Sequence, residues 1–400
     1  MPLPLEGVRV LDLTNVMAGP YCSMVLGDLG AEVIKLENPD GDSTRKFEPK
    51  VNDESYCFAV LNRNKKSISL DVKDARGKEI LLRLAARSDI MMENFRPGVV
   101  KKLGIDYESV RQVNASIIYA SISGFGQTGP YGRKGGFDII AQGMSGIMMM
   151  TGHPGGRPAK VGIAMNDIAC GVTTLYGLLG AYIGKLRHGQ GQYLETSLLE
   201  AGLAWSIWEF GAYMGGGELP TATGTRHRRS APYQAFRSRD GYVTLGASGD
   251  KLWRAFATQV VEQPQWLDDP RFATNPLRVR NADALQELIE AILVTQSTGH
   301  WVEKLDAAGV PGGPVYTFDQ TLRDPQVLHR QMVHEIEHPV IGPMKTLGLP
   351  LKSTGALTAI RQPAPLLGQH SRDILRDLGY TDGDTQALIA QGVVRETRLA

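Results

Sequence analysis

The residues best suited to carry out chemistry are Asn166 and Asp167, which precede a long apolar run at 168–184 (IACGVTTLYGLLGAYIG). Asp and Asn are preferred at helix N-termini, where their side chains satisfy free backbone N–H groups. Taken alone, the pair therefore fits a helix cap first. The same helix terminus also stabilises a carboxylate anion, so Asp167 is compatible with a nucleophile as well. The loop before it, VGIAMND, is rich in small residues and leaves space for a ligand beside the carboxylate.

A second candidate is the basic run Arg226, His227, Arg228, Arg229, which lies in a loop rich in Gly and Thr. A solvated basic loop is the default interpretation of such a run. The alternative is a clamp for a substrate carboxylate, because the guanidinium fork binds a carboxylate at two points. The sequence leaves both interpretations open.

The run from His334 to His338 (HEIEH) matches a zinc-protease pattern that needs both histidines on one face of a helix. Here Pro339 follows at once, and apolar and charged residues alternate as in an edge strand. In a strand the two imidazoles would be ~13 Å apart. We therefore expect no metal site here.

The first turn, 14–20 (TNVMAGP), invites a dinucleotide-binding interpretation, because Glu37 ends the next strand where a ribose-binding acid would lie. The glycine fingerprint of such sites is missing, however. We therefore do not expect NAD binding. The loop can still present backbone N–H groups and a helix N-terminus to an anionic ligand.

The elements that position these groups alternate between strand-like and helix-like segments over the first 200 residues. We expect strands at 8–13, 32–37, 89–93 and 116–122, and helices at 20–29 and 78–87. This alternation predicts an α/β fold with a parallel sheet, whose ligands bind at the carboxyl ends of the strands. Residues 1–214 would form the large domain, 215–330 a smaller α+β domain, and 331–400 a C-terminal segment.

Composition excludes several classes of protein. The formal net charge of +1 provides no field that would favour nucleic acid or an anionic membrane surface. Cys22, Cys57 and Cys170 form no disulfide framework, and the N-terminus has no signal-peptide pattern, so we expect a cytoplasmic protein. The apolar run at 168–184 is short for a membrane span and contains Gly and Thr, so we expect a buried helix.

A set of segments, in order and over nearly the whole chain, resembles the class III CoA-transferases, the CaiB/BaiF family. Among them are LEGVRVLDLTNVMAGPYCSMVLGDLGAEVIKLENPDGD, LNRNKKSISLDVK, MMENFRPGVVKKLGI, GFDIIAQGMSG, NDIACGVTTLYGLLGAY and PAPLLGQHSRDILRDLGY. The resemblance implies a Rossmann-like large domain, a smaller domain and a C-terminal segment returning to the first. It also implies a homodimer of two interlocked chains.

The resemblance assigns the nucleophile to Asp167. Its carboxylate would attack the thioester of an acyl-CoA donor, giving an aspartyl anhydride and then an aspartyl-CoA thioester, from which CoA passes to a carboxylic acid acceptor. Coenzyme A would be a substrate, with no permanently bound cofactor and no metal. The implied CoA-binding positions are Met17, Ala18, Asn38, Leu70, Asp71, Val72, Lys73, Asn94, Phe95, Arg96, Lys102, Gly135, Gly136, Phe137 and Asp138.

The chain departs from its relatives at several positions. Asn38 lies where some relatives have an arginine for the nucleotide, which puts one charge contact in doubt. Asn15 replaces a histidine of formyl-CoA relatives, and 246–249 (GASG) lacks their consecutive glycines. Both departures argue against the formyl/oxalate pair of substrates.

Two other functions compete with CoA transfer. An α-methylacyl-CoA racemase needs a histidine in the position held by Phe137, and a phenyl ring cannot exchange protons. A non-catalytic CoA- or nucleotide-binding protein would have lost the nucleophile, whereas Asp167 is present. Arg226, Arg228 and Arg229 favour a dicarboxylic acid such as succinate as the acid of the donor.

Overall fold

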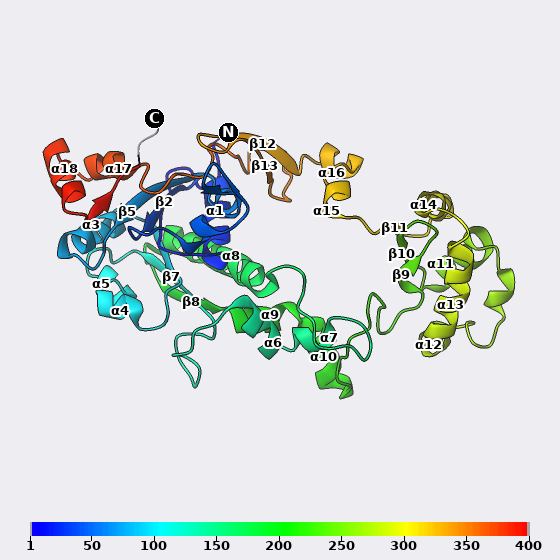
Figure 1. Ribbon diagram of the computed structural model, residues 1–400. Coiled ribbons are helices and arrows are strands. Elements are labelled where there is room, and N and C mark those ends of the chain that lie inside the picture. Colours follow the sequence, from blue (N-terminus) through cyan, green and yellow to red (C-terminus); the bar gives the residue numbers. More distant parts are fainter. Residues whose placement is uncertain (1, 398–400) are drawn as a thin grey trace. The chain divides into compact units, whose positions relative to one another are not determined.

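The computed structural model describes residues 2–397, and its internal contacts divide the chain into two compact units. Unit 1 comprises the described residues of 1–147, 160–218 and 328–400, and unit 2 comprises 148–159 and 219–327. Each unit has its own sheet (Figure 1). The assignment of 148–159 to unit 2 is a grouping that the sequence pattern alone did not indicate.

Seven strands within the described residues form the main sheet of unit 1, in the order β14-β5-β2-β1-β6-β7-β8. Six of them are parallel to their neighbours, and β14 pairs antiparallel with β5 at one edge. The predicted α/β fold with a mainly parallel sheet is therefore confirmed. The strands are β1 (Arg9–Asp12), β2 (Glu32–Glu37), β5 (Lys65–Leu70), β6 (Ile90–Glu93), β7 (Ile118–Ser123), β8 (Tyr193–Ser197) and β14 (Val394–Arg395).

Helices cover both faces of this sheet, because consecutive strand residues point to opposite sides. On one face, Val10 of β1 belongs to a core with α1 (Ala18–Asp28) and α8 (Met165–His188). On the other face, Leu11 belongs to a core with α3 (Ala75–Ala86), α17 (Ser371–Asp377) and α18 (Asp382–Ala390). Near-continuous apolar strands such as β6 follow from burial on both faces.

Shorter elements complete unit 1 around the sheet. They are the hairpin β3 (Lys50–Val51) and β4 (Glu54–Ser55), followed by α2 (Tyr56–Leu61), α4 (Val99–Leu103), α5 (Tyr107–Val110), α6 (Asp138–Met144), α9 (Leu198–Trp205) and α10 (Ile207–Gly216). Near the C-terminus, β12 (Val333–His338) pairs with β13 (Gly342–Leu347).

The strand β12 decides the outcome for the HEIEH run. Its residues are extended and hydrogen-bonded to β13, so the prediction of a strand rather than a zinc-binding helix is confirmed. The Nδ1 atom of His338 accepts the backbone N–H groups of Val340 and Ile341 at 3.3 and 3.1 Å. Among residues 2–397, no group of three or more His, Cys, Asp or Glu side chains is placed to hold a metal ion.

The helix α8 differs from the expectation of a buried helix. It runs over 24 residues, and in the described chain it alone is long and apolar enough to cross a membrane by length and composition, yet only 33% of its most apolar window is buried. Ala169, Cys170 and Leu178 face the core, whereas Tyr176 and Leu186 are 60% and 70% exposed. The correction has a simple cause: α8 lies on one face of the sheet and buries one stripe only.

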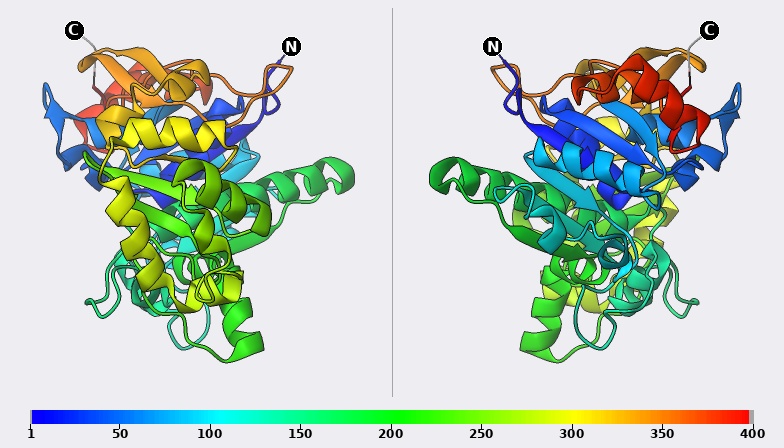
Figure 2. Two further views of the ribbon diagram at one scale, coloured as in Figure 1. Left: turned by 90° about the vertical axis from the view of Figure 1, so that its right-hand side faces the viewer. Right: turned by 90° about the vertical axis from the view of Figure 1, so that its left-hand side faces the viewer.

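Unit 2 is a smaller α+β unit. Its antiparallel sheet contains β9 (Tyr233–Arg237), β10 (Tyr242–Gly246) and β11 (Gly312–Pro314), and Figure 2 (left) faces these strands and the helices beside them. The helices are α11 (Asp250–Ala255), α12 (Asn275–Arg280), α13 (Ala282–Leu293), α14 (Thr298–Ala307) and α15 (Phe318–Thr321). Its core includes Trp253, Phe256 and Trp301.

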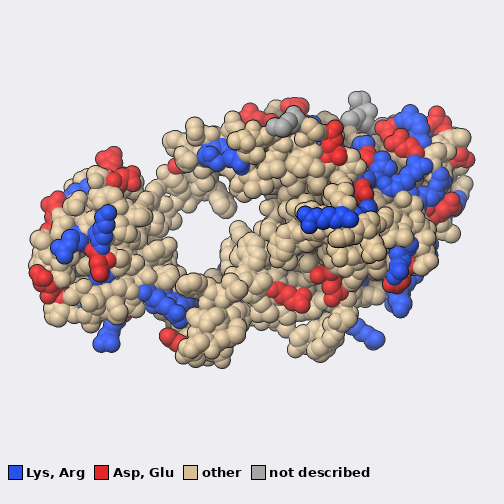
Figure 3. All heavy atoms as spheres, turned by 180° about the vertical axis from the view of Figure 1, so that it is seen from behind, with Lys and Arg blue, Asp and Glu red and all other residues tan. Residues whose placement is uncertain are grey.

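The distribution of charge agrees with the near-zero net charge. On the face shown in Figure 3, Lys and Arg side chains are interspersed with Asp and Glu, and neither sign covers the face alone. Such a surface provides no long-range attraction for a polyanion.

Candidate active site

The order of strands creates a crevice at one point of the main sheet. The chain places β2 and β5 on one side of β1, and β6 and β7 on the other. The loops that follow β1 and β6 therefore leave the sheet in opposite directions, and ligands of open parallel sheets bind at such a switch point. A pocket of about 370 Å³ lies there, within the size range of ligand sites.

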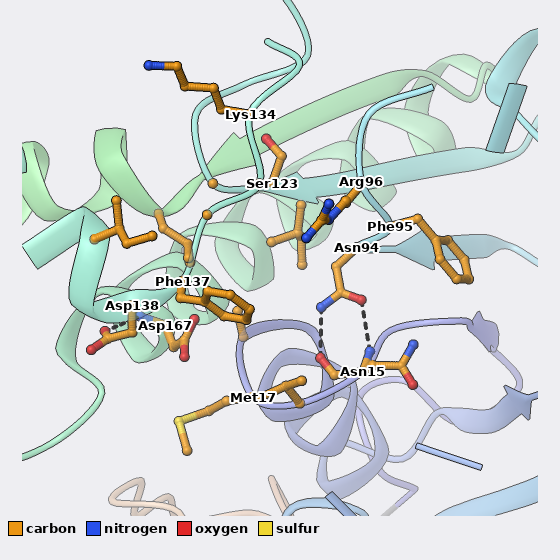
Figure 4. Close-up of a pocket in the computed structure, with 18 of the residues that line it drawn as sticks. Asn15, Met17, Asn94, Phe95, Arg96, Ser123, Lys134, Phe137, Asp138 and Asp167 are labelled. Atoms are coloured by element: carbon orange, nitrogen blue, oxygen red, sulfur yellow. Dashed lines mark hydrogen bonds between the residues drawn. The ribbon is translucent and has the colours of Figure 1, made fainter. Parts of the chain in front are cut away.

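Unit 1 supplies all the residues that line this pocket (Figure 4). They follow β1 (residues 15–18) and β6 (94–97), or belong to the end of β7 and the loop after it (122–124 and 134–138), together with Ile140, Asp167 and Leu198. Apolar side chains and a few polar groups converge here, as is typical of sites that bind small molecules.

Asp167 is the third residue of α8, and it does not cap that helix. The position before the helix is Ala164, which makes no side-chain capping bond. The capping role expected of Asn166 and Asp167 is thus wrong, and the cap comes from another segment. The Asp138 Oδ1 atom accepts the backbone N–H groups of Asn166 at 2.8 Å and of Asp167 at 3.3 Å. The Asp167 carboxylate is left to face the pocket.

The environment of Asp167 favours its protonated form. Burial, and after it the negative charge of Asp138, raises the pKa of Asp167 to about 7. A carboxyl group tuned into this range in a pocket marks a candidate functional group. At neutral pH both protonation states are accessible, and ionisation produces an anion in an apolar setting that hydrates it poorly.

Gln142 connects Asp138 to the segment that leads into α8. Its Nε2 atom donates to Asp138 Oδ2 at 2.7 Å, and its Oε1 atom accepts the backbone N–H of Val161 at 2.9 Å. The side chain of Gln142 is fully buried. Helix α6 therefore holds both the start of α8 and the stretch before it. Sequence reasoning missed Gln142, although it lies one helical turn after Asp138.

A second buried carboxyl group, Glu93, ends β6, directly before the pocket-lining turn at 94–97. Glu93 accepts the backbone N–H of Phe95 at 2.8 Å and the hydroxyl hydrogen of Ser121. Burial raises the pKa of Glu93 to about 7. Since Phe95 lies between two pocket-lining residues, Glu93 shapes the turn that presents Asn94 and Arg96. The apolar strand around Glu93 was the one sequence signal for it.

The structure gathers ten of the residues predicted to act on the substrate into this pocket. They are Met17, Ala18, Asn94, Phe95, Arg96, Gly135, Gly136, Phe137, Asp138 and Asp167. The roles assigned to them stay predictions. The sequence analysis did not single out Lys134, which also lines the pocket and has its Nζ atom 4.1 Å from the ring centre of Tyr131. Its place beside Gly135 and Gly136 was the available signal.

The remaining predicted CoA-binding residues of unit 1 do not line the pocket. Asn38 follows β2, and Leu70 ends β5, the neighbouring parallel strand, with 71–73 directly after it. These residues therefore lie on the same carboxyl edge of the sheet as the pocket. Lys102 belongs to α4, which follows the 94–97 turn. Asn38 Oδ1 accepts the N–H of Asp40 at 2.8 Å, so its side chain shapes its own turn.

The basic run belongs to unit 2 and is not among the residues that line the pocket. The guanidinium group of Arg226 is engaged within unit 2, at 2.8 Å from both Asp283 Oδ1 and Gln286 Oε1. The side chains of His227 and Asn275 hold the Arg229 backbone, at 3.2 Å from its N–H and 2.9 Å from its carbonyl oxygen. Within the described chain, the guanidinium groups of Arg228 and Arg229 themselves form no hydrogen bond or ion pair. Arg226 therefore has a structural role within unit 2, whereas the guanidinium groups of Arg228 and Arg229 remain available to a ligand.

The fold and pocket define an α/β protein with a ligand site at the switch point of its parallel sheet. The model of CoA-transferase family III matches residues 5–371. The chain is similar to succinyl-CoA:glutarate CoA-transferase of Mus musculus, 39% identical over 396 residues (98% of this chain, 91% of that one). It is similar to acetyl-CoA:oxalate CoA-transferase of Acetobacter aceti, 39% identical over 332 residues (82% and 85%).

A solved structure agrees with these matches. A CaiB/BaiF family protein from Brucella suis superimposes with a TM-score of 0.86 at 34% identity, covering 94% of this chain and all of that one. The chain therefore belongs to CoA-transferase family III, and it is an enzyme of acyl-CoA metabolism that transfers CoA. The resemblance found in the sequence is confirmed.

Proposed function

We propose that this CoA-transferase works through covalent catalysis by Asp167. The observation that carries the proposal is the position of its carboxylate: it lines the switch-point pocket, in the first turn of α8, with its pKa near 7. Poor hydration makes an ionised carboxylate a stronger nucleophile, and the helix N-terminus together with the backbone N–H groups nearby stabilises the charge that develops. Loss of CoA thiolate from a thioester then requires no metal.

The proposed reaction proceeds in four balanced steps. An oxygen of Asp167 attacks the donor thioester carbonyl, the C–S bond breaks, and an acyl-aspartyl anhydride and CoA thiolate result. The thiolate attacks the aspartyl carbonyl of the anhydride, which releases the donor acid and leaves an aspartyl-CoA thioester. The acceptor carboxylate attacks that thioester and regenerates an anhydride and thiolate. The thiolate finally attacks the acceptor carbonyl and frees Asp167.

Trapping with hydroxylamine tests this chemistry. Incubation with succinyl-CoA and hydroxylamine, followed by peptide mass spectrometry, is expected to place a hydroxamate on Asp167. Asp167→Asn is expected to yield no adduct and to lose roughly four or more orders of magnitude in kcat, as removal of a nucleophile does. A hydroxamate on any other residue, or none on the wild-type protein, contradicts the proposal.

We further propose that the acids exchanged are dicarboxylic. Glutarate and oxalate, the acids in the names of the two relatives above, both carry two carboxylates. The pocket supplies the cations Arg96 and Lys134, and Arg96 forms no hydrogen bond or ion pair with other described side chains. The carboxylate clamp expected at Arg228 and Arg229 stays a prediction, and the engagement of Arg226 within unit 2 argues against that residue.

A panel of acceptors tests the substrate class. With succinyl-CoA as donor, we expect transfer to glutarate and similar dicarboxylates with higher kcat/KM than to monocarboxylates of equal length. Asn15 and residues 246–249 differ from the formyl-CoA relatives, which use oxalate. We therefore expect oxalate to be a poorer acceptor than glutarate. Failure of every dicarboxylate beside success of monocarboxylates would reject the assignment.

The homodimer implied by the resemblance is part of the proposal. In its support, α10 exposes large apolar side chains: Ile207, Trp208 and Met214 are 74%, 70% and 76% exposed. Several exposed large apolar side chains on one helix are typical of an interaction surface. Light scattering coupled to size-exclusion chromatography is expected to give twice the chain mass of 43.5 kDa. A single-chain mass at micromolar concentration contradicts it.

A further inference from the structure

The loop at 14–18, which joins β1 to α1 and lines the pocket, is bound to the rest of unit 1 through its backbone. The N–H and C=O groups of Thr14 and Asn15 and the N–H of Val16 all pair with side chains from outside the loop. Loops normally satisfy such groups with water or with their own turns. This loop instead has its path dictated by neighbouring residues.

The most symmetric of these contacts involves Asn94, which follows β6. Its Nδ2 atom donates to the Asn15 carbonyl oxygen at 2.7 Å, and its Oδ1 atom accepts the Asn15 N–H at 2.8 Å (Figure 4). The side-chain amide of Asn94 thus bonds both the N–H and the C=O group of Asn15, as the backbone of a neighbouring β-strand does. The two segments joined are the loops that diverge at the switch point, which are 79 residues apart in sequence.

A buried ion pair also contacts the loop. The Nζ atom of Lys35 donates to the Thr14 carbonyl oxygen at 2.8 Å and forms an ion pair with Asp42 at 3.0 Å, and both side chains are 0% exposed. Asp42 Oδ1 accepts the N–H of Val16 at 3.4 Å. Burial disfavours the charge on Lys35, but the carboxylates of Asp42 and Asp12 outweigh it and raise the pKa of this lysine. The pair is therefore charged and fixed.

These contacts act on a strained conformation. Val16 has a φ of +70°, in the left-handed region that a β-branched residue rarely adopts. Such a residue persists only when its surroundings over-determine it, and strain of this kind is concentrated at functional sites. Met17 and Ala18 follow Val16 directly, so the direction in which they enter the pocket depends on this one backbone angle.

We propose that Asn94 is a positioning residue, whose side-chain amide holds the strained 14–18 loop so that Met17 and Ala18 are aligned with Asp167. This inference rests on the proposed role of Asp167. It differs from the CoA contact expected of Asn94, because both ends of the amide are already paired with Asn15. The charged pair Lys35–Asp42 contacts the same loop and does not line the pocket.

The test compares Asn94→Ala with a matched control, Asn114→Ala. Asn114 also joins two distant stretches, donating to the carbonyl oxygens of Ala85 and Ser88 at 3.0 and 2.8 Å, but it does not line the pocket. We expect Asn94→Ala to lower kcat roughly 10- to 100-fold, with the KM for acyl-CoA changed by less than about threefold. Asn114→Ala is expected to lower thermal stability and leave kcat within about twofold.

A double-variant cycle with Val16→Gly tests the role of strain. Glycine adopts a positive φ without cost, so the loop no longer needs the amide to stay in place. Asn94→Ala is expected to reduce kcat several-fold less in the Val16→Gly background than in the wild type. An equal reduction in both backgrounds overturns the inference. A raised KM for acyl-CoA at unchanged kcat also overturns it, since that result identifies a ligand contact.

Failure of this inference can be told from failure of the proposed nucleophile. Wild-type protein that gives no hydroxamate on Asp167 refutes the nucleophile, whatever Asn94→Ala does. Wild-type protein labelled on Asp167, with Asn94→Ala indistinguishable from Asn114→Ala in kcat, refutes the positioning role alone. Thermal melts of every variant confirm that the proteins compared are folded.

Discussion

The carboxylate of Asp138 accepts the backbone N–H of Asp167 at 3.3 Å, although the two residues are 29 positions apart. One acid therefore caps the helix that presents the other. The same contact has two opposite consequences for the proposed nucleophile. It holds the first turn of α8 in place, and it brings a second negative charge that raises the pKa of Asp167. These two consequences can be separated by substitution.

Asp138→Asn is expected to keep an acceptor for the helix and to remove the charge. Since the charge of Asp138 raises the pKa of Asp167 above its ordinary value, its removal lowers that pKa, and the ionised nucleophile appears at lower pH. The acidic limb of kcat/KM, expected near pH 7 in the wild type, should move to lower pH. Asp138→Ala should in addition lose the cap, which is worth about 1 kcal/mol, and lower kcat at every pH.

A matched control for this prediction is Asp106→Asn. Asp106 caps α5 by accepting the N–H of Ser109 at 2.8 Å and does not line the pocket. Its substitution should leave the pH profile in place. A profile of Asp138→Asn that coincides with that of the wild type would show that the charge of Asp138 does not reach Asp167.

Asp167→Asn should abolish transfer and yet stabilise the fold at alkaline pH. The folded-state pKa of Asp167, about 7, lies above the value of about 3.9 in an unfolded chain, so ionisation opposes folding as pH rises from 4 to 7. Each pKa unit corresponds to about 1.4 kcal/mol, and we expect a gain of roughly 1–3 kcal/mol at pH 8. At pH 4 the carboxyl group is protonated in the folded state and only about half ionised in the unfolded chain, so most of the gain should vanish. Urea unfolding at the two pH values measures it, and a gain independent of pH contradicts the assigned cause.

Much of the fold follows from patterns that are local in sequence. The expected strand at 32–37 coincides with β2, and the alternation at 334–338 predicts a strand against the competing helical motif. Both elements are specified by side-chain periodicity within a few residues. The gathering of residues from the first turn, the 94–96 turn and the 135–138 loop also follows, because parallel strands end at one edge.

The contacts that arrange the site could not be predicted in this way. Asp138 accepts a backbone N–H at the start of α8, Asn94 donates to the carbonyl oxygen of Asn15, and Lys35 donates to the carbonyl oxygen of Thr14. Each joins segments between 21 and 79 residues apart. Their residue types are ordinary for helix starts, turns and strands, so nothing local distinguishes them. Their function arises only from the order of strands in the sheet.

Chelators should leave the enzyme unaffected. His334 and His338 lie two pleats apart on β12, and the Nδ1 atom of His338 is occupied by two backbone N–H groups, so they cannot share one tetrahedral ion. We expect unchanged kcat after dialysis against EDTA or 1,10-phenanthroline, checked by the exchange assay with succinyl-CoA. Loss of activity that added zinc restores would contradict this reading of β12. His334→Ala, which alters the half-exposed member of the pair, should likewise leave kcat unchanged.

Whether the enzyme transfers CoA or racemises an α-carbon depends on which group faces Asp167. Exchange of an α-proton with inversion needs a second acid/base on the opposite face of the α-carbon. The candidate position holds Phe137, a residue that is 67% exposed and lines the pocket. Asp138 is not placed to be the second base, because its carboxylate accepts a hydrogen bond from the backbone N–H of Asp167 and so lies next to Asp167 rather than opposite it. With an α-methylacyl-CoA in D₂O, the wild-type enzyme should therefore leave the α-carbon unlabelled over many transfer turnovers. Deuterium at that carbon, lost again in Asp167→Asn, would instead identify a racemase.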